Sequence, residues 1–122
     1  MNNPKILITE DEVISAHYLK EMLENNGFHV LPIARSAEKS IKIALDNRPD
    51  VIIMDIRLQG ERDGIDAVCE IINKFNVPII FTTGNPLFLD DDRLKMVSNY
   101  TVLPKPPLDN ILLETINKML KS

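Results

Sequence analysis

The chain has 122 residues, 44% of them hydrophobic and 26% charged, which is the size and mixture of one ordinary globular domain. The 14 basic and 18 acidic residues give a formal net charge of -4 without any block of lysine or arginine, so direct binding to nucleic acid is not expected. The single cysteine, the lack of a signal-peptide pattern and the shortness of every apolar run predict a cytoplasmic protein without membrane contact.

Short runs rich in isoleucine and valine alternate with segments of helical period, a pattern typical of parallel βαβ units. We expect five strands, at residues 5–9, 30–34, 51–54, 78–82 and 100–103. Five helices are expected, at about residues 13–26, between Ser36 and Pro49, around 65–72, at 91–98 and at about 108–120. Residues 1–122 are therefore predicted to form one α/β domain, a doubly wound parallel sheet with helices on both faces.

The segment at 86–98 is the least regular part of this pattern. The expected helix at 91–98 carries few apolar residues, and the acidic run at 90–92 is interpreted as a solvated helix start rather than a cation site. The apolar residues at 86–89 fit either a partner surface or a loop that packs onto the core.

Polar side chains directly follow four of the predicted strands. They are Glu10 and Asp11 after the first strand, Asp55 after the third, Thr82 and Thr83 at the end of the fourth, and Lys105 after the fifth. Because the carboxyl ends of parallel strands meet at one edge of an open α/β sheet, we expect these side chains to lie close together. Three carboxylates at one edge repel one another unless a hard divalent cation lies among them, and oxygen ligands suit Mg²⁺. The sequence therefore predicts a Mg²⁺ site.

The same residues suit phosphoryl chemistry. An aspartate such as Asp55 can act as a nucleophile and form an acyl phosphate. Lys105 would bring a positive charge, and Thr83 a hydroxyl donor, to the oxygens of a phosphoryl group attached there. These residue types predict a phosphoacceptor centred on Asp55.

Five motifs carry this pattern along the chain: ILITEDE at 6–12, PDVIIMD at 49–55, DG at 63–64, PIIFTTG at 78–84 and KP at 105–106. In this order and at this spacing, they resemble the response-regulator receiver family of two-component phosphorelay systems over nearly the whole chain. The resemblance implies a flavodoxin-like sheet with strand order 2-1-3-4-5. It also implies a regulatory domain that catalyses only its own phosphorylation and dephosphorylation.

The resemblance implies a role for each matching residue. Asp55 corresponds to the phosphoacceptor, supplied by a sensor histidine kinase or a histidine phosphotransfer protein. Thr83, rather than Thr82, corresponds to the switch hydroxyl, and Lys105 to the phosphate-binding lysine, whose bond to Pro106 is cis in the family. The implied metal ligands are Glu10, Asp11, Asp55 and the backbone carbonyl of Arg57.

The implied switch and partner surface includes Val102, Tyr100 and Pro106. It belongs to a face made by the expected helix at 91–98, the strand at 100–103 and the helix at about 108–120, which in the family often mediates dimerisation or partner contact. Val102 stands where the family usually has an aromatic residue, and Tyr100 lies two residues earlier on the same face of the strand. The usual coupling between Thr83 and a rotating ring is therefore expected to be altered or absent. The loop at 56–64 is one residue longer than usual, and Arg57 within it is predicted to pair with the phosphoryl group and slow hydrolysis.

Two rival functions stay open. A small Mg-dependent phosphatase with an aspartate nucleophile shares this chemistry, but such enzymes place the nucleophile after the first strand with a second aspartate two residues on. A degenerate receiver used only for binding is the other rival, and the complete set of acids, threonine and lysine speaks against it. The cognate kinase, the output and the oligomeric state are not encoded in any motif, and the chain fits either a stand-alone regulator or one domain of a larger protein.

Overall fold

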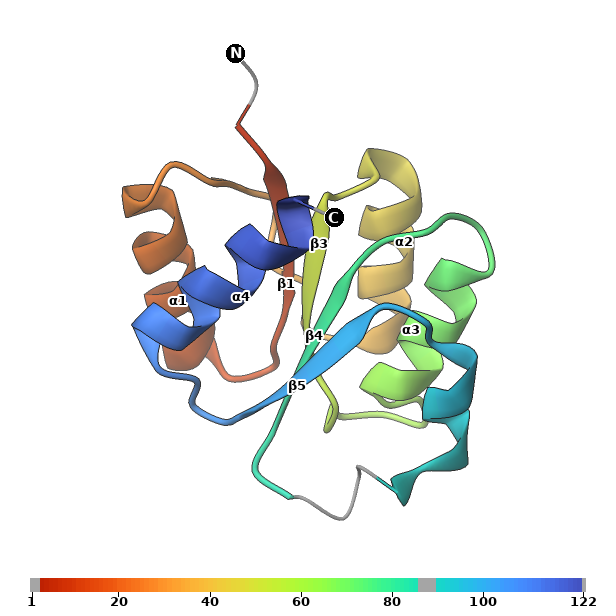
Figure 1. Ribbon diagram of the computed structural model, residues 1–122. Helices are drawn as coiled ribbons and strands as arrows, with labels where there is room; N and C mark the ends of the chain where they lie inside the picture. The colour runs from red at the N-terminus through yellow and green to blue at the C-terminus, as the bar shows by residue number, and fades with distance from the viewer. Residues whose placement is uncertain (1–2, 86–89, 122) are drawn as a thin grey trace.

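The computed structural model describes residues 3–85 and 90–121, so the apolar segment at 86–89 lies outside the described residues. Ten elements follow one another in the order β1 (Lys5–Thr9), α1 (Val13–Asn25), β2 (His29–Val30), α2 (Ala37–Asn47), β3 (Val51–Asp55), α3 (Gly64–Ile72), β4 (Ile79–Thr83), η2 (Asp92–Met96), β5 (Tyr100–Pro104) and α4 (Asp109–Lys121). The strands form one parallel sheet in the order β2-β1-β3-β4-β5, which confirms the predicted fold (Figure 1).

Helices cover both faces of the sheet because the strand side chains alternate between two hydrophobic clusters. In β1, Ile6 and Ile8 pack with residues of α1 and α4, whereas Leu7 between them packs with residues of α2 and α3. All five residues of β3 are buried, as the unbroken apolar run predicted. Figure 1 shows α1 and α4 together on one side of the sheet and α2 and α3 on the other.

The second strand is shorter than the predicted range 30–34. It pairs with β1 only through His29 and Val30, and Ala34 returns to β1 through a single bridge to Thr9. Pro32 lies between these two contacts, and a proline has no N–H to donate to a strand ladder. The ladder is therefore interrupted at Pro32.

The helix predicted at 91–98 is wrong in type and length. This segment forms η2, a 3₁₀-helix of five residues, so the described chain has four α-helices and not five. Leu94 is the only buried residue of η2, which explains why no longer amphipathic helix forms there. The side chain of Asp91 accepts a hydrogen bond from the backbone N–H of Arg93 and so caps this short element.

The register of the strands brings the predicted site residues to one edge. Thr9 pairs with Met54, Asp55 pairs with Thr82, and Thr83 pairs with Pro104. The residues that end or follow these strands therefore meet at the carboxyl edge of the sheet.

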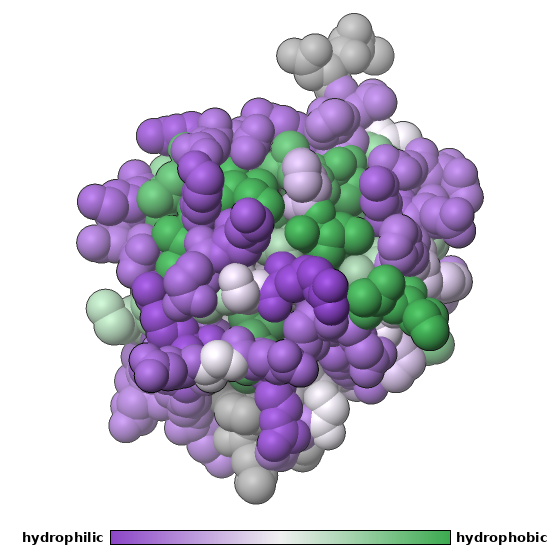
Figure 2. Space-filling model, turned by 180° about the vertical axis from the view of Figure 1, so that it is seen from behind, coloured by the Kyte–Doolittle hydropathy of each residue, from purple (hydrophilic) through white to green (hydrophobic). Residues whose placement is uncertain are grey.

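The surface is mostly hydrophilic, with separate hydrophobic patches on the face shown in Figure 2. The large hydrophobic side chains that are exposed on α1 and around the start of α4 are Val13, Ile14, Tyr18, Leu108 and Ile111. Among the described residues, no helix is both long enough and apolar enough to cross a membrane.

Candidate functional site

A cleft of about 520 Å³ opens at the carboxyl edge of the sheet. Five residues predicted from the sequence line it: Asp11, Asp55, Arg57, Thr83 and Lys105. Glu12 and Gln59 also line the cleft and were not predicted as site residues, and Asn85 lines it beside Thr83. The structure thus brings the predicted residues from β1, β3, β4 and β5 into one place.

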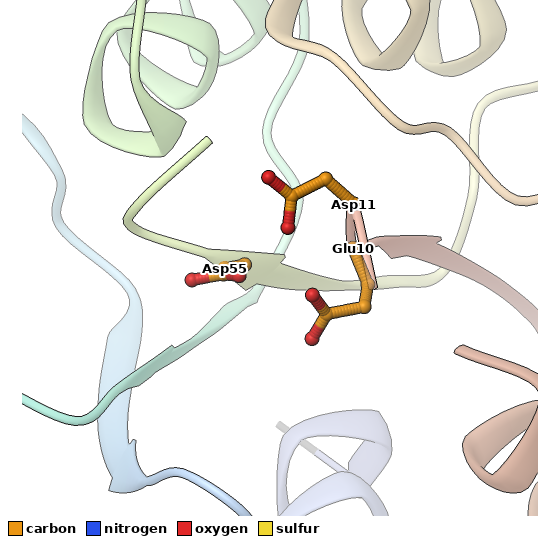
Figure 3. Close-up of side chains that lie close together, drawn as sticks. All are labelled: Glu10, Asp11 and Asp55. Atoms are coloured by element: carbon orange, nitrogen blue, oxygen red, sulfur yellow. The ribbon is translucent and has the colours of Figure 1, made fainter. Parts of the chain in front are cut away.

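Three carboxylates share this place, as Figure 3 shows for Glu10, Asp11 and Asp55. One oxygen from each lies within 4.8 Å of the other two. Glu10 and Asp55 are each only 3% exposed, whereas Asp11 is half-buried. Burial of carboxylates this close together costs free energy unless positive charge compensates them.

Lys105 supplies part of that charge. Its Nζ atom lies 2.7 Å from Oδ2 of Asp55 and 2.9 Å from Oε1 of Glu10. The backbone N–H of Lys105 donates to the carbonyl of Thr83, which fixes the residue just beyond the end of β5. The Lys105–Pro106 peptide bond is cis, as the family resemblance implied.

The charges shift the pKa values of two of these groups. Burial raises the pKa of the Glu10 carboxyl, and the hydrogen bonds that it accepts from Lys105 and from the N–H of Glu12 oppose this only in part. Burial alone would lower the pKa of Lys105, but its hydrogen bonds to Asp55 and Glu10 outweigh burial, so the pKa is raised. Lys105 therefore stays protonated at neutral pH.

The donor set fits a hard divalent cation. The three carboxylates, when ionised, and the ammonium of Lys105 together carry a net charge of minus two. Each of the three residues offers a carboxylate oxygen, and they come from two strand ends that the sheet holds in place. The site could therefore hold Mg²⁺ or a similar ion.

Both oxygens of Asp55 have a partner. Oδ2 accepts from Lys105, and Oδ1 accepts from the backbone N–H of Arg57 at 3.0 Å. Arg57 itself is exposed, and it lines the cleft between the buried side chains of Ile56 and Leu58. The longer loop thus anchors itself through these two apolar residues while it leaves Arg57 at the opening of the cleft.

Thr83 and Thr82 have different surroundings. The hydroxyl of Thr83 accepts from the N–H of Asn85 at 3.0 Å and lies 3.2 Å from the Asn85 carbonyl, and the residue lines the cleft. Thr82 instead lines a neighbouring groove against α1, and its carbonyl accepts from the N–H of Ile56. Of the two hydroxyls, that of Thr83 belongs to the cleft that contains Asp55.

The residues predicted for the switch surface lie on or next to β5. Val102 is partly buried against the hydrophobic cluster beneath α2 and α3. The half-exposed ring of Tyr100 contacts Phe81 of that cluster edge to face, with ring centroids 5.8 Å apart. Pro106 is exposed and borders the groove against α1, which has a volume of about 270 Å³.

Sequence reasoning missed the cluster around Arg93. Its guanidinium contacts Asp63, Asp66 and Asp91, although the acidic run at 90–92 was interpreted as solvated. The spacing of Asp63 and Asp66 is that of a capping box at the start of a helix, which the sequence displays. Their contact with Arg93 spans about 30 residues, and no local signal predicts it.

A doubly wound parallel sheet with an acidic cleft at its carboxyl edge makes this an open α/β protein whose site lies at the strand ends. The sequence pattern of response regulator receiver domains matches residues 6–117. The chain therefore belongs to the response regulator receiver family of two-component systems, whose receiver domains are regulatory.

Individual relatives agree with this assignment. The phyllosphere-induced regulator PhyR of Methylorubrum extorquens is 40% identical over 91 residues, which are 73% of this chain and 34% of that protein. The transcriptional regulatory protein PdtaR of Mycobacterium tuberculosis is 37% identical over 80 residues, 66% of this chain and 38% of that protein. The chain thus spans little more than a third of either relative.

A solved structure supports the fold. The signal receiver domain of a modulated diguanylate cyclase from Desulfovibrio desulfuricans G20 superposes with a TM-score of 0.88 at 32% identity. The superposition covers 98% of this chain and 95% of that one.

Proposed function

We propose that the chain accepts a phosphoryl group on Asp55 from a phosphohistidine of a sensor histidine kinase or histidine phosphotransfer protein, in a Mg-dependent reaction. The observation that carries the proposal is the environment of Asp55. Its side chain is buried to 3% exposure beside an open cleft, and both of its oxygens are oriented, one by Lys105 and one by the N–H of Arg57. A nucleophile held in this way loses little freedom on reaction.

The chemistry is a phosphoryl transfer between two side chains. A carboxylate oxygen of Asp55 attacks phosphorus, a P–O bond forms, and the P–N bond to the donor imidazole breaks. The electron pair of the broken bond stays on the imidazole of the donor. Lys105 lies close enough to Asp55 to stabilise negative charge first on the carboxylate and then on the phosphoryl oxygens. The Thr83 hydroxyl can donate to one of the phosphoryl oxygens.

Glu10, Asp11, Asp55 and the backbone carbonyl of Arg57 are the proposed ligands of the metal. A Mg²⁺ ion bound there would neutralise negative charge on the phosphoryl oxygens during the transfer. The proximity of the three carboxylates supports this assignment, since one oxygen from each falls within 4.8 Å of the others.

Hydrolysis by water then returns Asp55 to the carboxylate, so the domain acts as a timed regulator and not as an enzyme with turnover. The names of PhyR and PdtaR, as regulators, favour a regulatory output for this chain as well. We propose that residues 1–122 form one receiver domain in the cytoplasm. Copies of it could pair through the face of η2, β5 and α4.

The donor protein is proposed to dock on the groove between α1 and the loop that follows β5. Lys105 lines both this groove and the acceptor cleft, so the phosphohistidine of a partner bound in the groove would lie near Asp55. Ile14, which is 84% exposed, borders the groove and offers an apolar contact for a partner helix.

Incubation with acetyl phosphate and Mg²⁺, followed by intact mass measurement, tests the proposal. We expect one labile phosphoryl adduct on the wild type, none on Asp55→Asn, and an unchanged adduct on Asp46→Asn, a matched control at an exposed surface acid. Chelation of Mg²⁺ should abolish the adduct. Steady hydrolysis of a phosphate ester without the adduct would favour the phosphatase instead. Against that enzyme, Asp55 ends β3 and not the first strand, and Arg57 stands where the enzyme has its second aspartate.

A further inference from the structure

Arg93 joins η2 to the start of α3. Its guanidinium makes five hydrogen bonds of 2.6 to 2.9 Å to three carboxylates, those of Asp63, Asp66 and Asp91. We call these four residues the Arg93 cluster. The Arg93 side chain is 35% exposed, so each ion pair alone is weak, but a planar guanidinium bound to several carboxylates at once fixes geometry.

Two members of the Arg93 cluster form the capping box of α3. Oδ1 of Asp63 accepts from the N–H of Asp66 at 2.9 Å, and Oδ2 of Asp66 accepts from the N–H of Asp63 at 3.2 Å. Each carboxylate thus binds both the helix start and Arg93. If the first turn of α3 moves, Asp63 and Asp66 move with it, and their contacts with Arg93 change.

The first turn of α3 also lies against the acceptor strand. The N–H of Gly64 donates to the carbonyl of Ile56 at 2.8 Å. A Cβ atom built on Gly64 would lie only 2.2 Å from the backbone oxygen of Asp55, so the two backbones touch with no side chain between them. A change in the backbone at Asp55 or Ile56 is therefore transmitted to the helix start.

Apart from the Arg93 cluster, the segment is attached mainly by apolar packing, since Leu94 within η2 and Val97 directly after it belong to the hydrophobic cluster beneath α2 and α3. Leu94 is the one buried side chain of η2, while Met96 is 71% exposed. The Sγ atom of Cys69 on α3 lies 3.8 Å from the carbonyl of Arg93, a weak contact. The Arg93 cluster therefore supplies the charged contacts between η2 and the start of α3, beside this apolar packing.

We propose that Arg93 is a positioning residue that couples the state of Asp55 to the position of η2, through the backbone contact at Gly64 and the capping box of α3. This inference rests on the proposed phosphorylation of Asp55. Because Val102 stands in place of an aromatic switch residue, no ring at this position can rotate on phosphorylation. The coupling therefore uses charged groups and the backbone instead. Partners that read η2 would then respond to phosphorylation through Arg93.

The test is an NMR measurement on the ¹⁵N-labelled chain with Mg²⁺, before and after beryllofluoride is added as a phosphoryl mimic. Backbone signals of Arg57 and Thr83 report the adduct at Asp55, and those of residues 92–97 report η2. In the wild type both sets of signals should shift. In Arg93→Met the acceptor signals should still shift, whereas the shifts of residues 92–97 on adduct formation should be lost.

Two further variants separate this coupling from a merely structural role. Arg93→Lys keeps the positive charge but lacks the planar guanidinium that binds several carboxylates at once. It should therefore retain only part of the signal shifts of residues 92–97 on adduct formation. Arg62→Met is the matched control, because Arg62 pairs with Glu70 on α3 at 2.6 Å without contacting η2, and its response should equal that of the wild type.

Each outcome has a clear reading. An adduct that forms while residues 92–97 do not shift in the wild type would overturn the coupling and leave the proposed function intact. Equal shifts of η2 in Arg93→Met and wild type would overturn the role of Arg93. Absence of any adduct would overturn the proposed function and the coupling with it.

Discussion

Replacement of Gly64 by alanine tests how closely the start of α3 is held against the acceptor strand. The new Cβ atom would lie 2.2 Å from the backbone oxygen of Asp55 and 2.9 Å from Cγ of Met54. Because the nearer atom belongs to the backbone, it cannot rotate away as a flexible side chain can. Either the Asp55 carbonyl or the first turn of α3 must move by roughly an ångström.

The magnitude follows from two opposing effects. Overpacking costs about 1–3 kcal/mol, and the upper value applies here because the contact is with backbone. Alanine gains roughly 0.5–1 kcal/mol over glycine in a helix. The net loss in the free energy of unfolding is therefore about 2 kcal/mol, which lowers Tm by roughly 7 °C in a domain of this size. Thermal unfolding followed by circular dichroism measures it.

Gly84 provides the matched control, since a Cβ atom built there meets no heavy atom within 4 Å. Gly84→Ala lies at the same edge of the sheet and should change Tm by no more than about 2 °C. If Gly64→Ala unfolds at the same temperature as the wild type or higher, the close approach of α3 to Asp55 does not exist as described.

Four further outcomes are expected. Lys105→Met should bind Mg²⁺ roughly tenfold more tightly by calorimetry, because the ammonium no longer competes for the carboxylates; equal or weaker binding would contradict this. Arg57→Ala should shorten the lifetime of the phosphorylated protein, and an unchanged lifetime would argue against its pairing with the phosphoryl group. Ile14→Asp should slow transfer from a phosphorylated histidine protein but not from acetyl phosphate; equal slowing of both would place Ile14 outside the docking surface. Arg93 holds the pKa of Asp91 at about 2 through hydrogen bonds, below the usual 3.8. The wild type should therefore be more stable than Arg93→Met in urea unfolding, with the full difference above pH 3.8 and a smaller one as the pH falls toward 2. A difference that stays constant through this window would exclude that linkage.

The sequence predicted those features that depend on local pattern and on the geometry common to parallel sheets. The unbroken apolar run at 51–54 identified the central strand, and the polar residues at the ends of four strands identified the edge where Asp55, Glu10 and Lys105 meet. This worked because parallel strands place their carboxyl ends at one edge whatever the details of helix packing.

The remainder depended on contacts between distant residues. The sequence shows Pro32 but not where this proline falls in the ladder with β1. Its effect on the second strand therefore depends on the register of the two strands. The helix predicted at 91–98 was wrong because only Leu94 and Val97 are buried there, and long-range contacts of Arg93 help to fix the segment. Such long-range ion pairs leave no periodic signal in the sequence.

The two edges of the sheet also bear on how copies of the chain associate. An exposed edge strand can recruit a strand from another molecule, because it offers unpaired N–H and C=O groups. Here β2 has two residues and Pro32 lies two residues after it, while β5 ends in Pro104, which has no N–H to offer. Sheet extension between molecules is thus blunted at both edges. Crowded copies should therefore stay free of β-aggregation, and any association between them should use side-chain surfaces instead of added strands.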